Sequence, residues 1–418
     1  MAALSSGHCA TDFANGALPA LLPFFVDKFD LSYTLAAAAM LASAVSSSIV
    51  QPLFGLWSDR RGAIWLLPAG VALAGAGIAV ACVAPSYPLV LALVVLSGLG
   101  VAAYHPEGSK FAAFASGRRR ASGMSLFSIG GNIGFALGPT IATPLVLAFG
   151  LAGGLLLAAP CVVVAIALLA LVPFLGSFAP EGDRRVRSKE PDRIGALLLL
   201  LGVIAFRGVS WFGLITFVPL WEVSLGHSKA HGNRLLSLML LAGGLGTLLA
   251  GPLADRVGRR PVLIASTAAT PPLIVVFIVL GGVPGAIALA GIGMSVIGTF
   301  GVTMVMSQEY LPRHIGTASG LSIGLSIGLG GVGAVALGAV ADTIDLRAAM
   351  YVAAASALAA LALAVLLPSA RPAPLAAERS SRRPSESGPR PVFAAPGSFG
   401  RDSEVAALMA GVDDDAFG

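Results

Sequence analysis

The chain has 418 residues, of which 56% are hydrophobic and only 11% are charged. Soluble domains carry about a quarter charged residues, and a mean hydropathy of +0.88 leaves too little polar surface for a water-soluble protein of this length. The composition therefore excludes the soluble classes and predicts a membrane protein. The formal net charge of +5 does not indicate a nucleic-acid partner, because the basic residues lie in short clusters between apolar segments.

Twelve apolar segments are long enough to cross a bilayer as helices of about 20 residues. The first begins near Met1 without a basic region or a cleavage site, so we interpret it as a span and not as a signal peptide. In chain order the predicted spans are 3–27, 34–57, 63–84, 87–112, 121–147, 150–175, 194–220, 232–254, 261–282, 285–307, 316–340 and 346–367.

Cysteine usage and nucleotide motifs indicate neither a cofactor nor an enzyme. The three cysteines, Cys9, Cys82 and Cys161, lie in apolar runs without metal-ligand spacing. No G-x-x-x-x-G-K-[ST] loop occurs, so ATP is not the expected energy source. We expect no metal, no cofactor and no enzymatic activity.

The loops between the spans predict the orientation. One set of loops holds fourteen basic residues, whereas the other set holds only Lys28, Lys229, Arg234 and Arg347. Because basic loops stay in the cytoplasm, we expect both termini there and a multi-pass protein of the inner membrane. Residues 176–193 form the longest polar interruption and are predicted to be a cytoplasmic linker, and the Pro, Ser and Arg-rich residues 368–418 a disordered tail.

The two halves of the chain repeat each other. GLWSDRRG at 55–62 recurs as GPLADRVGRR at 251–260, so that Asp59 and Asp255 are 196 residues apart. ASGMSLFSIG from Ala121 recurs as ASGLSIGLSIG, with an offset of 197 residues to Ala318. These offsets predict an all-α membrane protein of two pseudo-symmetric six-helix bundles, residues 1–175 and 194–367, with a central site between them.

The same motifs carry a family resemblance over about residues 7–367. The twelve spans, the middle loop and the duplicated G-x-x-x-D-R-x-G-R-R resemble the major facilitator superfamily. HCATDFANGALPALLPFF, SSSIVQPLFGLWSD, YHPEGSKFAAFASG, GGNIGFALGP and QEYLPRHIGTASG are similar to the fosmidomycin resistance group within it. The resemblance implies the major facilitator fold and proton-driven efflux of small molecules, and it leaves the substrate open.

The duplicated loop motif is a candidate gate. Its carboxylates can pair with neighbouring arginines and cap a helix N-terminus, which would hold the cytoplasmic side closed when the cavity opens outward. The alternative is a plain basic loop with an incidental Asp. The first copy also departs from the family pattern, since Ala63 and Ile64 follow Gly62. The candidate gate residues are Gly55, Asp59, Arg60, Gly251, Asp255, Arg256, Arg259 and Glu309, the last expected to join Arg256 or Arg259.

GGNIGFALGP places Gly130, Gly134 and Gly138 four residues apart, with Pro139 following. This spacing puts the glycines on one helix face, where another helix can pack closely. Gly134, Gly138 and Pro139 resemble the helix-five motif of antiporters, G-x-x-x-G-P. Plain small-residue packing is the alternative, because the chain is rich in glycine throughout.

Ionisable residues inside spans are costly and indicate function. In the first span His8, Asp12 and Asn15 follow 3–4 spacing, so they share one face and are expected to line the cavity. The duplication offset carries Asp12 to within one residue of Arg207 in the seventh span. We therefore expect both at similar depth, as a pair that forms and breaks during transport or as a permanent structural ion pair.

YHPEGSK at 104–110 brings ionisable groups into the fourth span. Successive helical residues turn by about 100°, so His105 and Glu107 cannot both face the cavity unless Pro106 distorts the turn. Glu107 is the predicted proton carrier, and His105 is predicted to assist the proton step or to bind substrate. Lys110 is placed to pair with Glu107. The alternative is a device that only kinks the helix.

The predicted function is a proton-coupled antiporter that exports a small molecule by alternating access. Asp12, Glu107 and His105 are the predicted proton-coupling residues, and Asn15, His105, Arg207 and Trp211 the predicted substrate-binding residues. Arg207 with Trp211 would hold an anionic or aromatic group. The partners of the protein would be protons, substrate and lipid, without nucleic acid, and the chain is expected to be monomeric. Two alternatives remain: uptake of a metabolite, and a membrane sensor without transport.

Overall fold

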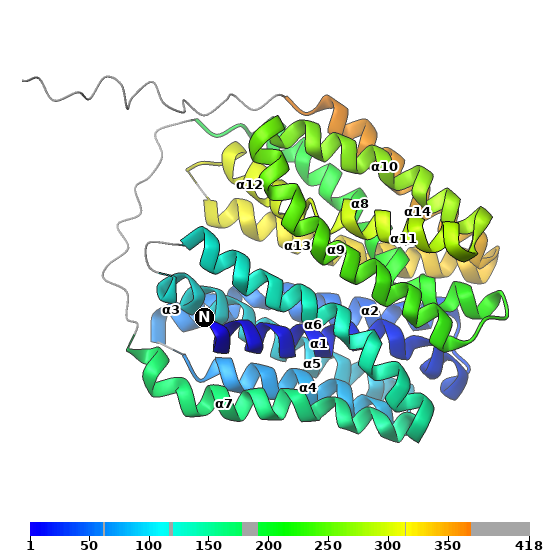
Figure 1. The fold of residues 1–418 in the computed structure, drawn as a ribbon, viewed down its shortest axis with the longest axis horizontal. Coiled ribbons are helices and arrows are strands. Elements are labelled where there is room, and N and C mark those ends of the chain that lie inside the picture. Colours follow the sequence, from blue (N-terminus) through cyan, green and yellow to red (C-terminus); the bar gives the residue numbers. More distant parts are fainter. Residues whose placement is uncertain (62, 117–119, 178–190, 314, 369–418) are drawn as a thin grey trace, which may run out of the picture. The chain divides into compact units, whose positions relative to one another are not determined.

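The structure is a computed structural model that describes residues 1–61, 63–116, 120–177, 191–313 and 315–368. The described residues are almost entirely helical (Figure 1). Most of the predicted linker and all but residue 368 of the predicted tail lie outside them. So do the side chains of Asp59 and Arg60, so the structure describes Gly55 of the first copy of the candidate gate but not its charged side chains.

The helices of the first half are α1 (Ala2–Phe29), α2 (Tyr33–Ser48), α3 (Gln51–Arg61), α4 (Leu66–Val83), α5 (Tyr87–Ala115), α6 (Arg120–Phe149), the short 3-10 helix η2 (Leu151–Leu157) and α7 (Ala158–Gly176). Those of the second half are α8 (Ile194–Ser224), α9 (Lys229–Val257), α10 (Arg259–Leu280), α11 (Gly282–Val296), α12 (Phe300–Tyr310), α13 (Ile315–Thr343) and α14 (Leu346–Leu366).

These helices make up twelve spans, as the sequence predicts. The described residues contain twelve segments long and apolar enough to cross a membrane. Two spans are interrupted, the second between α2 and α3 and the tenth between α11 and α12. Pro106 leaves α5 uninterrupted from Tyr87 to Ala115, so the helix does not break at that proline.

Helix pairing repeats between the halves. In the first half α1 packs on α6, α4 on α5 and on α7, and α2 on α5. In the second half α8 packs on α13, α10 on α11 and on α14, and α9 on α11. The two halves meet chiefly through α2 against α13 and α6 against α9, and each of these pairs is the image of the other under the duplication. The pseudo-symmetry expected from the repeated motifs is therefore present in the packing.

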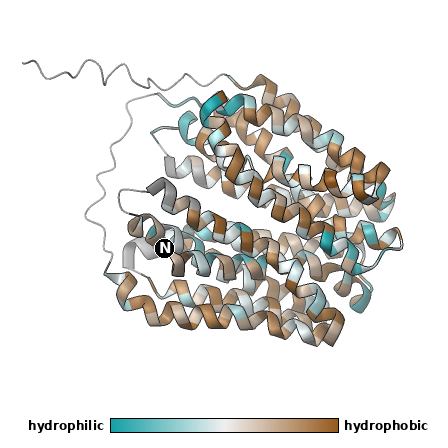
Figure 2. Ribbon diagram, viewed as in Figure 1, coloured by the Kyte–Doolittle hydropathy of each residue, from teal (hydrophilic) through white to brown (hydrophobic). Residues whose placement is uncertain are grey.

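The outer surface of the bundle is apolar. Hydrophobic residues follow most of the length of the helices, whereas hydrophilic ones gather at the turns (Figure 2). On α7, Val163, Ile166 and Leu169 are each more than 60% exposed. Exposed aliphatic side chains at this density suit hydrocarbon and not water.

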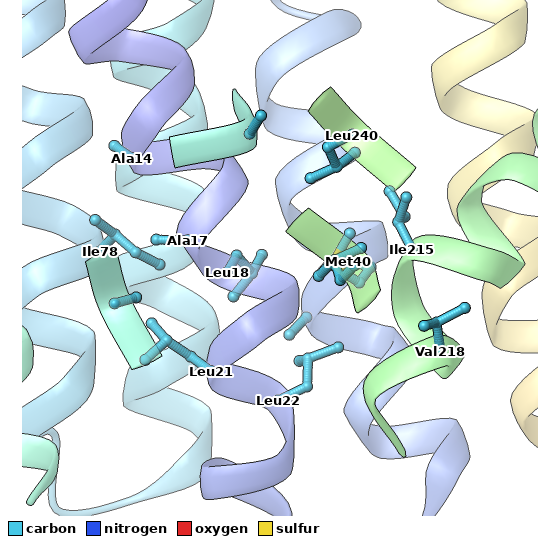
Figure 3. Close-up of a cluster of buried hydrophobic side chains, with 14 of the residues drawn as sticks. Ala14, Ala17, Leu18, Leu21, Leu22, Met40, Ile78, Ile215, Val218 and Leu240 are labelled. Atoms are coloured by element: carbon cyan, nitrogen blue, oxygen red, sulfur yellow. The ribbon is translucent and has the colours of Figure 1, made fainter. Parts of the chain in front are cut away.

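We call the side that carries Met1 and the start of α8 the N-terminal side, and the side of the turns near residues 30 and 344 the distal side. On the distal side an apolar cluster fills the space between the halves. Leu18 and Leu22 of α1 and Met40 of α2 approach side chains of the second half there (Figure 3). The members from the second half are Ile215, Val218 and Leu240.

Hydrogen bonds join the halves on the same side. Asp342 of α13 accepts from the backbone N–H groups of Tyr33 and Thr34 at 2.8 and 2.9 Å, at the start of α2. Asn233 of α9 donates to the carbonyl of Ala20 at 3.0 Å and to the Thr143 hydroxyl at 2.8 Å. Every hydrogen bond described between the two halves lies on the distal side, so the bundle is held closed there.

The glycines along one face of α13 show that the two halves are apart on the N-terminal side. Gly338 and Gly331 abut α2, where an added Cβ would overlap Thr34 and Ala44. Gly324 and Gly320 continue the same face toward the N-terminal side, and an added Cβ there would meet no atom within 4 Å. The halves therefore diverge toward the N-terminal side.

Candidate functional site

A cavity of about 480 Å³ lies between the halves. Its lining includes six residues that the sequence singled out, namely His8, Asp12, Asn15, His105, Arg207 and Trp211. Asp12 and His105 each lie ten residues from the N-terminal-side end of their helices, and Arg207 lies thirteen. At 1.5 Å per residue these positions lie about 15 to 20 Å along their helices from that end, and both Asp12 and Arg207 line the same cavity.

On the first-half wall, two histidines and a carboxylate converge. His8 Nε2 lies 3.1 Å from His105 Nε2 and 3.3 Å from Asp12 Oδ2. His105 Nε2 lies 3.2 Å from Asp12 Oδ1. We call His8, Asp12 and His105 the central cluster.

Backbone carbonyls orient both imidazoles. His8 Nδ1 lies 2.8 Å from the carbonyl oxygen of Phe127, and His105 Nδ1 lies 2.9 Å from that of Val101. A carbonyl oxygen only accepts, so each Nδ1 carries a hydrogen, and in a neutral ring Nε2 then offers only a lone pair. Two lone pairs and a carboxylate cannot face one another at these distances. An additional proton shared among these three groups would remove that repulsion.

Packing keeps the central cluster in place. The His8 ring stacks on Phe127 with centroids 4.1 Å apart. Gly131 of α6 leaves room for the cluster, since an added Cβ would overlap His8 Nε2 and Asp12 Oδ2. Further along the same face of α6, Gly134 and Gly138 pack against the backbone of α1 at Cys9 and Gly16, which is the close approach expected from the glycine spacing.

On the second-half wall, Arg207 stabilises the interruption of the tenth span. Its Nη2 donates to the carbonyls of Ser295 and Val296 at 3.3 and 2.9 Å and to the Thr299 hydroxyl at 2.5 Å. Backbone carbonyls freed inside a membrane need such partners, and a cation suits the carbonyl end of α11. Arg207 therefore has a structural role, in addition to lining the cavity.

The described structure does not join Asp12 to Arg207. The carboxylate of Asp12 faces His8 and His105, whereas the described hydrogen bonds of Arg207 go to α11 and Thr299. The two walls thus carry separate charges, one acidic with two imidazoles and one guanidinium.

Glu107 lies away from the cavity. Its side chain is 1% exposed, and its Oε2 lies 2.8 Å from Lys110 Nζ. His105 faces the cavity and Glu107 does not, as the 100° rotation between helix positions requires when α5 stays regular.

Neutral polar groups complete the cavity. Asn15 accepts a hydrogen bond from the Ser43 hydroxyl at 3.0 Å. The Ser48 hydroxyl lines the cavity, is buried, and has no hydrogen-bond partner among the described atoms. Asn132 lines the cavity as well. His8 lay on the polar face predicted for the first span. Gly131, Ser48 and Asn132 were missed, because small and neutral residues give no signal in a glycine-rich and serine-rich chain.

The second copy of the candidate gate is partly assembled. Glu309 of α12 pairs with Arg259 of α10, one of the two partners expected for it. Asp255 and Arg256 at the end of α9 are exposed, and no ion pair of Asp255 occurs among the described side chains. The gate is expected to close when the cavity opens to the other side, and that role stays a prediction.

Comparison with known proteins identifies the family. The profile of the Major Facilitator Superfamily matches residues 4–322 and 200–411. The chain is 32% identical over 353 residues to YfnC, an uncharacterised transporter of this superfamily from Bacillus subtilis, covering 82% of this chain and 86% of the relative. It is 29% identical over 351 residues to the fosmidomycin resistance protein of Escherichia coli, with the same two coverages.

Solved structures show the same fold at low sequence identity. A bacterial homologue of the human lysosomal transporter Spinster, inward-facing and occupied, superposes with a TM-score of 0.72 at 15% identity, covering 89% of this chain and 98% of that one. The inward-open xylose transporter XylE of Escherichia coli gives 0.71 at 13% identity, covering 88% and 96%. With twelve spans, a duplicated packing and these relatives, the chain is a multi-pass membrane transporter, not an enzyme, and belongs to the Major Facilitator Superfamily.

Proposed function

We propose that the chain is a proton-coupled antiporter of the inner membrane that exports a small molecule with an anionic group. The observation that carries this proposal is the central cluster, in which two Nε2 lone pairs and a carboxylate share a space that needs a proton. Asp12, with His105 and His8, takes the part of proton carrier. Glu107, which the sequence singled out for that part, is paired with Lys110 outside the cavity.

The positive-inside rule makes the N-terminal side the cytoplasmic side. On that assignment the cavity opens to the cytoplasm and is closed toward the outside by the apolar cluster and by Asp342 and Asn233. A cavity in this state is ready to receive a substrate from the cytoplasm. Return of the protonated chain to this state would release the proton inside, and alternation of the two states would exchange one for the other.

The charges of the cavity also indicate which substrate can compete with a proton. Loss of the proton leaves a net negative cluster with three acceptors, which favours a substrate group that donates hydrogen bonds or carries positive charge. Arg207 on the opposite wall favours an anionic group. We therefore infer a substrate with an anionic end toward Arg207 and a donor end toward Asp12. The Ser48 hydroxyl is a further contact for it.

Fosmidomycin, the compound named for the Escherichia coli relative, is a phosphonate and is the first substrate to test. Purified chain in liposomes with an acidic lumen should accumulate the labelled compound, because protons leave as substrate enters. Asp12→Asn should reduce gradient-driven accumulation to that of empty liposomes, since the cluster can no longer exchange its proton. Glu107→Gln is the control and should retain accumulation.

Three outcomes contradict the proposal. Accumulation driven by an acidic bath and not by an acidic lumen would indicate symport. Accumulation without dependence on pH would indicate facilitated diffusion. If Glu107→Gln abolishes coupling and Asp12→Asn preserves it, the proton carrier is Glu107, and the central cluster serves only in binding.

A further inference from the structure

A second group of two histidines and a carboxylate lies on the distal side, away from the cavity. His227 Nδ1 lies 2.6 Å from Glu222 Oε2, and His231 Nε2 lies 3.4 Å from the same oxygen. The three potential ligand atoms all lie within 4.8 Å of one another. We call Glu222, His227 and His231 the distal cluster.

The turn between α8 and α9 builds this arrangement. α8 ends at Ser224, and Gly226 takes a positive φ of 86° that returns the chain toward α8. Ser228 caps the N-terminus of α9 by accepting from the backbone N–H of His231. Gly232 packs against Pro219 and the Cβ of Glu222, where a side chain would not fit. The close contact brings His231 within reach of a carboxylate on the neighbouring helix.

The exposure of the three side chains suits a ligand that arrives from solvent. Glu222 is 4% exposed, so its carboxylate is fixed within the packed helix end. His227 and His231 are 51% and 38% exposed. The ring centroids of the two histidines are 4.9 Å apart. Both rings contact the same carboxylate oxygen of Glu222. A ligand from solvent can therefore reach both imidazoles, whereas the carboxylate is buried.

We propose that the distal cluster binds a divalent transition-metal ion, with Zn²⁺ as the reference ion. Zn²⁺ takes imidazole and carboxylate ligands at about 2.0–2.2 Å, which places neighbouring tetrahedral ligands about 3.3 Å apart. The 3.4 Å between His231 and Glu222 meets that spacing. His227 would have to retreat by less than about 1 Å from its hydrogen bond, which its exposure permits. Water would complete the coordination.

The electrostatic surroundings leave room for a cation. Lys229 is paired with Asp27 of α1, and Arg347 lies over the ring of Trp221, 5.8 Å from its centroid. The C-terminal end of α8 at Ser224 favours positive charge, whereas the start of α9 opposes it. With Glu222 ionised, the distal cluster carries the negative charge that a metal ion requires.

The test is a titration of the purified full chain in detergent, treated with chelator, with Co²⁺ and then Zn²⁺. We expect one Co²⁺ per chain with the visible absorption of a four-coordinate site, displaced by Zn²⁺. His231→Gln and Glu222→Gln should each weaken binding by at least about tenfold. Gel filtration shows whether each variant is folded. His231→Gln should disturb folding less than Glu222→Gln, because His231 is partly exposed and Glu222 is buried.

The central cluster offers the same kinds of ligand, so a His8→Gln/His105→Gln double variant is the matched control and should retain the Co²⁺ spectrum. If the spectrum is lost in that variant and kept in His231→Gln, the metal site is in the cavity and the proposal is wrong. If the wild-type chain binds neither ion at micromolar concentrations, the distal cluster is a hydrogen-bonded group only, and the proposal is wrong as well.

Discussion

At the scale of single residues, Gly131 shows how little space the central cluster leaves. The residue faces His8 Nε2 and Asp12 Oδ2 from α6, and any side chain would displace both. Phe127, one turn before Gly131, stacks on the His8 ring and supplies its carbonyl acceptor. One face of α6 therefore sets the positions of two of the three titratable groups.

We expect Gly131→Ala to impair proton coupling and to destabilise the chain by about 1–3 kcal/mol, the usual effect of overpacking. The measurement is gradient-driven accumulation per folded chain, with thermal unfolding in detergent. Gly195→Ala is the control, because an added Cβ there meets no atom within 4 Å. Full coupling in Gly131→Ala would show that the cluster tolerates displacement.

Part of the site could be predicted from the sequence. The 3–4 spacing placed His8, Asp12 and Asn15 on one face, and the duplication offset placed Arg207 at the depth of Asp12. The rotation of α5 could not be predicted, because a spacing of two residues shows only that His105 and Glu107 face different ways. The partners of Arg207 are carbonyls at the end of α11, and backbone groups leave no trace in residue spacing.

At the scale of helices, the spans were predicted closely because each is a long apolar run with few charged residues. The interruptions were not. The tenth span breaks around Gly298 and Thr299 without a proline, where Arg207 takes up the freed carbonyls. α5 continues through Pro106. Tertiary contacts decide where a membrane helix can be interrupted, and such contacts lie far apart in the sequence.

The N-terminus of α2 is capped from the other half of the bundle. Asp342→Ala removes the two hydrogen bonds to Tyr33 and Thr34. A lost cap costs about 0.5–2 kcal/mol, so the distally closed state should lose a factor of roughly 2 to 30 in population. The measurement uses a chain without native cysteines that carries Ser237→Cys, a position on the distal side that is 8% exposed. This cysteine should react faster with a thiol reagent when Asp342→Ala is added than when Asp342 is kept.

Asp345→Ala is the matched control for this prediction. Asp345 caps α14 by accepting from the Ala348 N–H at 2.6 Å, within a single half. The Asp345→Ala substitution removes the same kind of cap on the same side of the bundle, and the two halves should stay together. Equal effects of the two variants would show that Asp342 stabilises a helix end and does not hold the halves together.

At the scale of the whole molecule, one face of α13 meets the first half at its distal end and leaves it at the other. Gly324→Cys should therefore react with an impermeant thiol reagent applied from the N-terminal side and not from the distal side. Ala334→Cys, at a fully buried position of the same helix, should be protected from both. Equal labelling of residue 324 from both sides would contradict the observed closure.

The two walls of the cavity show how the two halves have come to differ since the duplication. The carboxylate and both imidazoles come from the first half, and the guanidinium comes from the second, at nearly corresponding positions. A chain assembled from two copies of residues 1–175 would keep the scaffold but would oppose two carboxylates with no arginine between them. The copies have thus diverged into complementary partners, and neither can now replace the other.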